Sequence, residues 1–237
     1  MTDDVRPSSV RVGGGRQQLA EEVASYVRDL ILSGQVKNGE FLRLEPIADA
    51  LGVSNTPVRE GLLVLRGEGF VDLVPRRGFV VGSFTRQDVE DLFWTQSVLA
   101  GELAARAATR ITKDDVIRLA EVHAAHGQAV EAGDLAAIAK LGHEFHRIVN
   151  RAAGSPRLAA LLSTTVQYLP NSLYASIEAS VQSTMHAHPA ILDALERGNA
   201  RLARAQMRDH ILASGQSLID TLAARGIWDV SADSEAS

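Results

Sequence analysis

The stretch from residue 83 to about residue 226 contains few prolines and repeatedly shows the residues that begin helices. It is rich in alanine and leucine, which favour helix formation, and only Pro156, Pro170 and Pro189 interrupt it. Residues able to cap a helix N-terminus recur at Thr85, Thr112, Asp134, Ser155 and Asn199. Thr85 and Thr112 are each followed three residues later by aspartate, which resembles a capping box. The pattern therefore predicts an all-helical bundle of about six helices.

The N-terminal part has a different pattern. Apolar residues recur at helical spacing over residues 17–33, where Gly34 supplies a stop. A second helix of about two turns is predicted to end at Gly52, and Ser54 can cap a third. The buried stripe of this third helix is predicted to be Val58, Leu62 and Leu65.

The third helix is followed directly by a strand, a turn and a strand. Gly69 breaks the helix, residues 70–74 and 79–81 have the composition of strands, and Pro75-Arg76-Arg77-Gly78 has that of a turn. Three helices followed by a basic two-stranded wing are typical of a domain that binds the grooves of DNA. The predicted fold class is therefore mainly α, with an N-terminal winged helix-turn-helix, a two-stranded wing and a C-terminal all-α bundle.

The predicted organisation is a disordered arm, a winged helix, a helical domain and a disordered acidic tail, over residues 1–16, 17–82, 83–228 and 229–237. The chain has 237 residues and no cysteine, which excludes a disulfide framework and thiolate metal sites. No apolar run approaches the roughly 20 residues of a membrane span, and the acidic N-terminus lacks the apolar region of a signal peptide. We expect a cytoplasmic protein without a membrane partner.

The net charge of −5 argues against coating of nucleic acid by bulk electrostatics, so any DNA contact must be local. Asn55 and Arg59 lie four residues apart on one face of the third helix, with Thr56 beside them. Arginine can bind guanine and asparagine can bind adenine in the major groove, while hydroxyls such as that of Ser54 can bind phosphate. Taken alone, the same residues would be read as a helix cap and a solvated charge.

Residues 17–82, above all "ALGVSNTPVREGLLVLRGEGFVDLVPRRGFVV", resemble the winged helix of the GntR family of bacterial regulators. In that family the serine-rich cap, the arginine matching Arg59, and the basic residue and glycine matching Arg77 and Gly78 contact DNA. Arg76 lies beside them at the wing tip. The family usually has arginine where this sequence has Asn55, a difference that bears on operator preference.

Residues 85–226 resemble the helical ligand-binding domain of the FadR subfamily, the FCD domain, most clearly in "FHRIVNRAAGSPRLAALL" at 145–162. The resemblance implies a small-molecule effector. It also leads us to expect a homodimer on a near-palindromic double-stranded operator, because two-fold protein symmetry requires two half-sites.

All seven histidines lie in this second domain. In metal-binding members of the subfamily, three histidines and an aspartate bind a divalent metal. The histidine positions match His146, His188 and His210, whereas the aspartate position is Gly142. Three imidazoles suit Zn, Ni or Mn, with water completing the shell. His123 and His126 are predicted to lie on a solvated face.

The resemblance places Gln96 and Ala100 where the subfamily has an arginine and a glutamate on the first helix of the domain. The candidate effector-binding residues are Gln96, His143, Arg147, Tyr168 and Asn171. We look for them in the bundle core, where facing helices commonly build ligand sites.

The function predicted is a sequence-specific transcriptional regulator, a repressor and not an enzyme, whose effector is an organic acid. One alternative is a metal-dependent enzyme using the three histidines, although no His-Glu-x-x-His motif or phosphate loop is present. The other is a winged helix that binds protein, which would lack the steep salt dependence of DNA binding.

Overall fold

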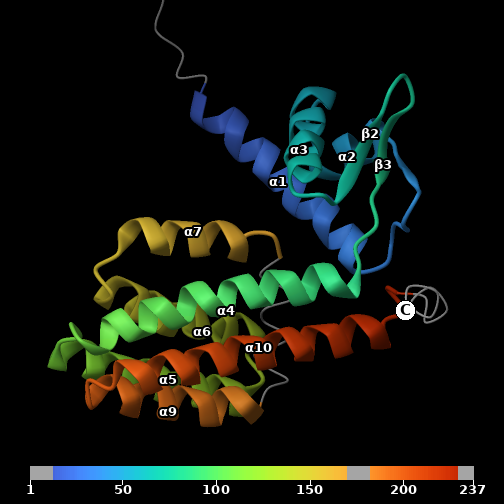
Figure 1. Cartoon of the computed structure of the whole chain (residues 1–237). Coiled ribbons are helices and arrows are strands. Elements are labelled where there is room, and N and C mark those ends of the chain that lie inside the picture. The colour runs from blue at the N-terminus through green and yellow to red at the C-terminus, as the bar shows by residue number, and fades with distance from the viewer. Residues whose placement is uncertain (1–12, 170–181, 229–237) are drawn as a thin grey trace, which may run out of the picture. The chain divides into compact units, whose positions relative to one another are not determined.

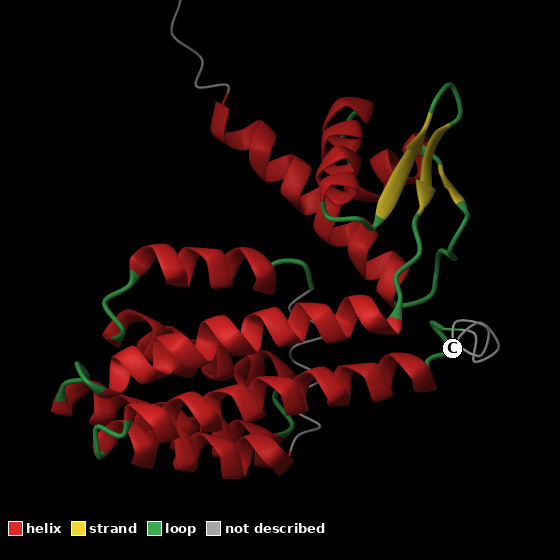
Figure 2. Ribbon diagram, viewed as in Figure 1, coloured by secondary structure: helices red, strands yellow, loops and turns green. Residues whose placement is uncertain are grey.

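The computed structural model describes residues 13–169 and 182–228. The chain divides into two compact units, Met1–Phe84 and Thr85–Ser237. Both are built mainly from helices, and a small antiparallel sheet lies in the first (Figure 2), so the predicted fold class is confirmed. Most of the predicted arm and the whole predicted tail lie outside the described residues. Residues 13–16 were predicted to belong to the disordered arm, but they begin the first helix.

The helices of the first unit are α1 (Gly13–Leu32), α2 (Leu44–Leu51) and α3 (Asn55–Gly67). α2 ends at Gly52, whose left-handed backbone (φ 65°) is the conformation that glycine adopts without strain. The stripe predicted for α3, Val58, Leu62 and Leu65, is fully buried, so α3 is anchored through one face and presents the other to solvent.

The sheet contains β1 (Phe41–Leu42), β2 (Val71–Val74) and β3 (Gly78–Val81), in the order β1-β3-β2. β2 and β3 form the predicted wing, with Val74 opposite Gly78 at the turn. β1 adds a third strand, with Phe41 opposite Val80. A strand of two residues is too short to show the alternation of apolar and polar residues that predicts a strand. β1 forms because it pairs with β3, which is distant in the sequence.

Gly61 allows α1 and α3 to pack closely. A Cβ at this position would lie 2.7 Å from both the carbonyl oxygen of Ala20 and the Cβ of Val23. We expect Gly61→Ala to lower the free energy of unfolding of the first unit by about 1–3 kcal/mol, because overpacking outweighs the gain in helix propensity. Gly67→Ala, on the same helix with open space around it, should be neutral or stabilising by about 0.5–1 kcal/mol. Urea denaturation checks both, and equal effects would refute this account of the packing.

The second unit is a helical bundle of α4 (Arg86–Ala108), α5 (Lys113–Ala132), α6 (Leu135–Ala152), α7 (Pro156–Val166), α9 (Gln182–Glu196) and α10 (Ala200–Ala224). α4 and α10 pack side by side along its length (Figure 1). Its core combines small and large side chains, with Leu103, Phe145 and Leu195 fully buried. Within the described ranges, no helix is both long and apolar enough to cross a membrane.

Local capping accounts for most helix starts in this unit. Thr85 and Thr112 form complete capping boxes with Asp88 and Asp115, and the side chains of Asp134 and Asn199 accept hydrogen bonds from the first turns of α6 and α10. Ser155 precedes α7 without making a capping hydrogen bond.

Candidate nucleic-acid interface and histidine site

The N-terminal end of α3 presents an exposed polar surface. Ser54, Asn55, Thr56 and Arg59 are all exposed, and the first turn of α3 contains no acidic residue. Ser54 has an extended backbone at the N-cap, but its side chain makes no capping hydrogen bond. The positive end of the helix dipole is therefore unopposed within its own first turn and suits contact with a phosphate.

The wing tip is a tight turn between β2 and β3. The N–H of Arg77 donates to the carbonyl of Val74 at 3.1 Å. Arg76 has a positive φ of 65°, which residues other than glycine rarely adopt, and its side chain is exposed. The guanidinium of Arg77 lies 4.4 Å from the ring centroid of Phe41, a cation–π distance, and Gly78 follows with φ 101°. Two arginines thus stand at the tip, one of them held against β1.

Three histidines from separate helices converge in the bundle. One ring nitrogen each from His146 on α6, His188 on α9 and His210 on α10 lies within 4.8 Å of the others. The Nε2 atoms of His146 and His210 are 3.2 Å apart. Ring centroids are separated by 5.0, 5.2 and 5.6 Å. Imidazoles that share one ion through bonds of about 2.0–2.1 Å have centroids roughly 5 Å apart.

Two of these histidines are buried with unsatisfied nitrogen atoms. Among the described residues, neither ring nitrogen of His188, nor Nδ1 of His210, has a hydrogen-bond partner. Burial first, and then neighbouring imidazoles, lower the pKa of His188 well below its ordinary value. Burial, with a contribution from His126, lowers the pKa of His210 to about 4. Both rings are therefore neutral near pH 7, with lone pairs available for a ligand.

The prediction that His123 and His126 lie on a solvated face is wrong. His126 is only 1% exposed, and His123 is half-buried. Their ring centroids lie 5.9 and 5.8 Å from that of His188. The burial arises because α5 packs against α9, a contact between segments far apart in the sequence. Phe145 stacks on His188 at 3.9 Å and fixes its ring plane.

A cavity of about 670 Å³ adjoins the histidines. Gln96, His143 and Arg147, three of the predicted effector residues, line it together with His146 and His210. The side chain of Gln96 is buried and donates to the carbonyl of Thr165 at 3.1 Å.

Of the two remaining effector candidates, the structure describes Tyr168 alone. Tyr168 is half-buried and is not one of the described residues that line the cavity, and Asn171 lies outside the described residues. Sequence reasoning missed Asn150, Arg151 and Ser214, which also line it. Asn150 and Arg151 follow His143 and Arg147 at helical spacing, and this polar stripe was the available signal.

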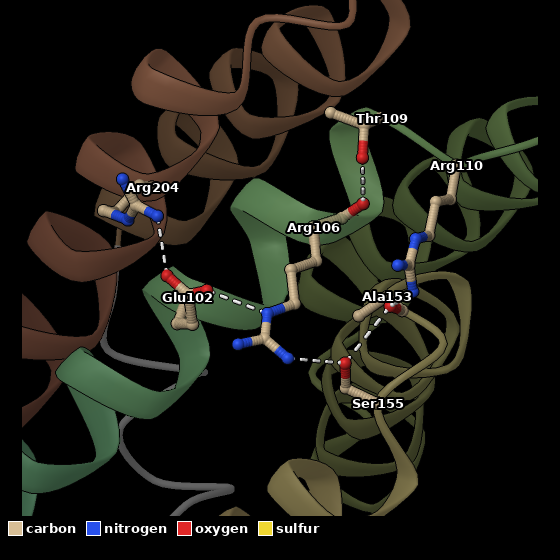
Figure 3. Close-up of polar contacts among 7 residues, drawn as sticks. All are labelled: Glu102, Arg106, Thr109, Arg110, Ala153, Ser155 and Arg204. Carbon is tan, nitrogen blue, oxygen red and sulfur yellow. Dashed lines mark hydrogen bonds and ion pairs between the residues drawn. The ribbon is translucent and has the colours of Figure 1, made fainter.

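The turn between α6 and α7, which forms one edge of the cavity, is fixed by α4 (Figure 3). Arg106 donates to the hydroxyl of Ser155 at 2.9 Å, and Arg110 donates to the carbonyl of Ala153 at 2.7 Å. Glu102 accepts a hydrogen bond from Arg106 at 2.8 Å and orients it. The hydroxyl of Ser155 therefore serves a tertiary contact instead of a helix cap.

Comparison with known proteins agrees with both units. Residues 19–81 match the model of bacterial regulatory proteins of the gntR family, and residues 91–213 match that of the FCD domain. The chain belongs to the GntR family. It combines the family's DNA-binding unit with an effector-binding FCD domain and is a DNA-binding transcriptional regulator, so the enzyme alternative is not supported.

Sequence similarity to known regulators extends over most of the chain. The Glc operon transcriptional activator of Escherichia coli K12 is 29% identical over 86% of this chain and 91% of its own. A probable D-xylose utilization operon transcriptional repressor of Paenarthrobacter nicotinovorans is 30% identical over 81% and 86%. The E. coli McbR/YncC structure has the same fold, with a TM-score of 0.62 and 23% identity over 87% of this chain and 97% of that one.

Proposed function

We propose that this GntR-family regulator is a homodimeric cytoplasmic repressor controlled by a carboxylate-bearing metabolite bound in the FCD cavity. The observation that carries the proposal is the charge of the cavity. Arg147 and Arg151 supply its positive charge, whereas no described lining residue is acidic. A concave site lined by one sign of charge concentrates ligands of the opposite sign.

A divalent metal beside the cavity is the second part of the proposal. Two nitrogens of His188 and one of His210 are buried without hydrogen-bond partners in the part of the chain that the structure describes. Each such atom costs about 1–3 kcal/mol unless a ligand satisfies it. His146, His188 and His210 would hold the ion, and the ion would supply a Lewis acid that attracts a carboxylate oxygen. Since His146 and His210 also line the cavity, metal and effector would be neighbours.

A two-fold dimer would present α3 twice, to half-sites about 34–36 Å apart in a near-palindromic operator. The effector can alter operator affinity only by binding the DNA-competent and incompetent states of the dimer with different affinities. The D-xylose relative is named as a repressor and the Glc relative as an activator; repression is the mode of action that we propose.

Arg147 supplies the variant that tests the effector site. Arg147→Gln should weaken binding of the carboxylate by about tenfold or more, since charge-assisted hydrogen bonds contribute about 1.5–3 kcal/mol. Arg118 pairs with Glu144, as Arg147 does, but does not line the cavity. Arg118→Gln is therefore the matched control and should change affinity less than twofold. Calorimetric titration measures both, and equal losses would show that only the shared ion pair matters.

Native mass spectrometry of the purified protein tests the whole proposal. We expect the mass of a dimer, with one divalent ion per subunit and a co-purified organic acid. A monomer, or a dimer that carries a neutral ligand and takes up no metal on addition of Zn²⁺, would contradict it.

A further inference from the structure

The candidate metal site contains three histidines and, among the described residues, no carboxylate. Every residue in the group is an imidazole donor, and a buried glycine, Gly142, lies on α6 one turn before His146. Glycine offers no ligand atom at this position.

The α5–α6 hairpin indicates that His126 lies at the level of Gly142. α5 and α6 pack against each other and are joined by a short turn at Gly133 and Asp134. His126 and Gly142 lie at equal sequence distances from Asp134, so an antiparallel pairing of the helices sets them at the same level. Both are buried.

His126 also lies close to the trio. Its ring centroid is 5.9 Å from that of His188, only slightly more than the 5.6 Å between His146 and His188. The ring nitrogens of His126 are not among those that lie within 4.8 Å of one another, so ligation requires a change in the conformation of this side chain.

We infer that His126 is a fourth protein ligand of the proposed metal site and replaces a carboxylate at Gly142. The inference rests on the proposed metal site. An all-imidazole set favours Zn²⁺, Ni²⁺ or Cu²⁺ over Mn²⁺ and Mg²⁺, which prefer carboxylate and water. Four neutral ligands also leave the full double positive charge of the ion, and a carboxylate of the effector would join the four imidazoles as a fifth ligand.

His123 provides a matched control. It lies on the same helix, and its ring approaches His188 as closely, at 5.8 Å. It is one turn away from the level of Gly142, however, and is half-buried rather than buried. A role that depended only on proximity to His188 would apply to both residues, whereas the inferred ligand role applies to His126 alone.

X-ray absorption of the full-length dimer loaded with Zn²⁺ tests the inference, because it reports the imidazoles bound to the ion. We expect four in the wild type and in His123→Ala, and three in His126→Ala. Zn²⁺ affinity should fall about 100-fold or more in the latter, beyond the loss of about 10- to 100-fold that follows removal of a residue that only hydrogen-bonds to a ligand. The double variant His126→Ala/Gly142→Asp should recover affinity and gain Mn²⁺ binding relative to Zn²⁺.

The possible results distinguish failure of the proposed metal site from failure of the assignment of His126 as a ligand. A wild type that binds no Zn²⁺ at micromolar concentration overturns the metal site itself and this inference with it. A wild type that binds Zn²⁺ through three imidazoles overturns the assignment of His126 alone, and this result requires no variant to fold. Loss of an imidazole in His123→Ala but not in His126→Ala would likewise overturn it.

Discussion

Replacing Arg59 with alanine should weaken specific operator binding by roughly thirtyfold or more while leaving the regulator folded. Arg59 is exposed on α3 one turn after Asn55, so its removal opens no cavity. A bidentate arginine–guanine contact contributes about 1–3 kcal/mol, and a dimer would present Arg59 twice. The expected loss is therefore about 2–6 kcal/mol, or roughly thirtyfold or more in affinity. Fluorescence anisotropy with an operator obtained by in vitro selection measures it.

Arg66→Ala is the control for charge. Arg66 lies on the same helix and is exposed, but in its last turn, where a positive charge compensates the helix dipole. The variant removes the same charge and should weaken operator binding less than threefold. Equal losses in the Arg59 and Arg66 variants would mean that α3 contributes only general electrostatic attraction.

His188→Leu should abolish metal binding and yet leave the metal-free protein at least as stable as the wild type. The site loses its central imidazole, so Zn²⁺ affinity should fall more than 100-fold. In the metal-free state, leucine removes two buried unsatisfied nitrogens, each of which costs about 1–3 kcal/mol. The free energy of unfolding should therefore stay equal or rise by up to about 3 kcal/mol, in part offset by the lost stacking on Phe145.

His186 on the same helix is exposed and provides the comparison. His186→Leu should keep the wild-type Zn²⁺ affinity. Urea denaturation with and without chelator, combined with a Zn²⁺ titration, distinguishes the cases. Marked destabilisation of the metal-free His188→Leu protein would mean that the histidine serves packing and not a ligand.

Features determined by neighbouring residues were predictable from the sequence. The capping boxes at Thr85 and Thr112 and the left-handed glycine at Gly52 each involve atoms only a few residues apart. The buried stripe of α3 follows from helical spacing alone. These local signals fix the order of elements and leave the polar side of α3 exposed.

Features that depend on distant segments were not predictable. β1 exists because Phe41 pairs with Val80, and its two residues show no pattern of their own. His126 looks like a surface residue until α9 packs against α5. Ser155 has the sequence of a helix cap, but Arg106 binds its hydroxyl. In each case a tertiary contact overrides a local preference.

The central claim is that the exposed face of α3 reads bases through Arg59. A double-mutant cycle tests it most directly, with the wild type and Arg59→Ala each titrated against the selected operator and against operators carrying a single guanine substitution in both half-sites. The account predicts one guanine whose replacement weakens wild-type binding at least tenfold but leaves binding of the variant unchanged. If every substitution weakens both proteins by the same factor, Arg59 reads no base and the account is wrong.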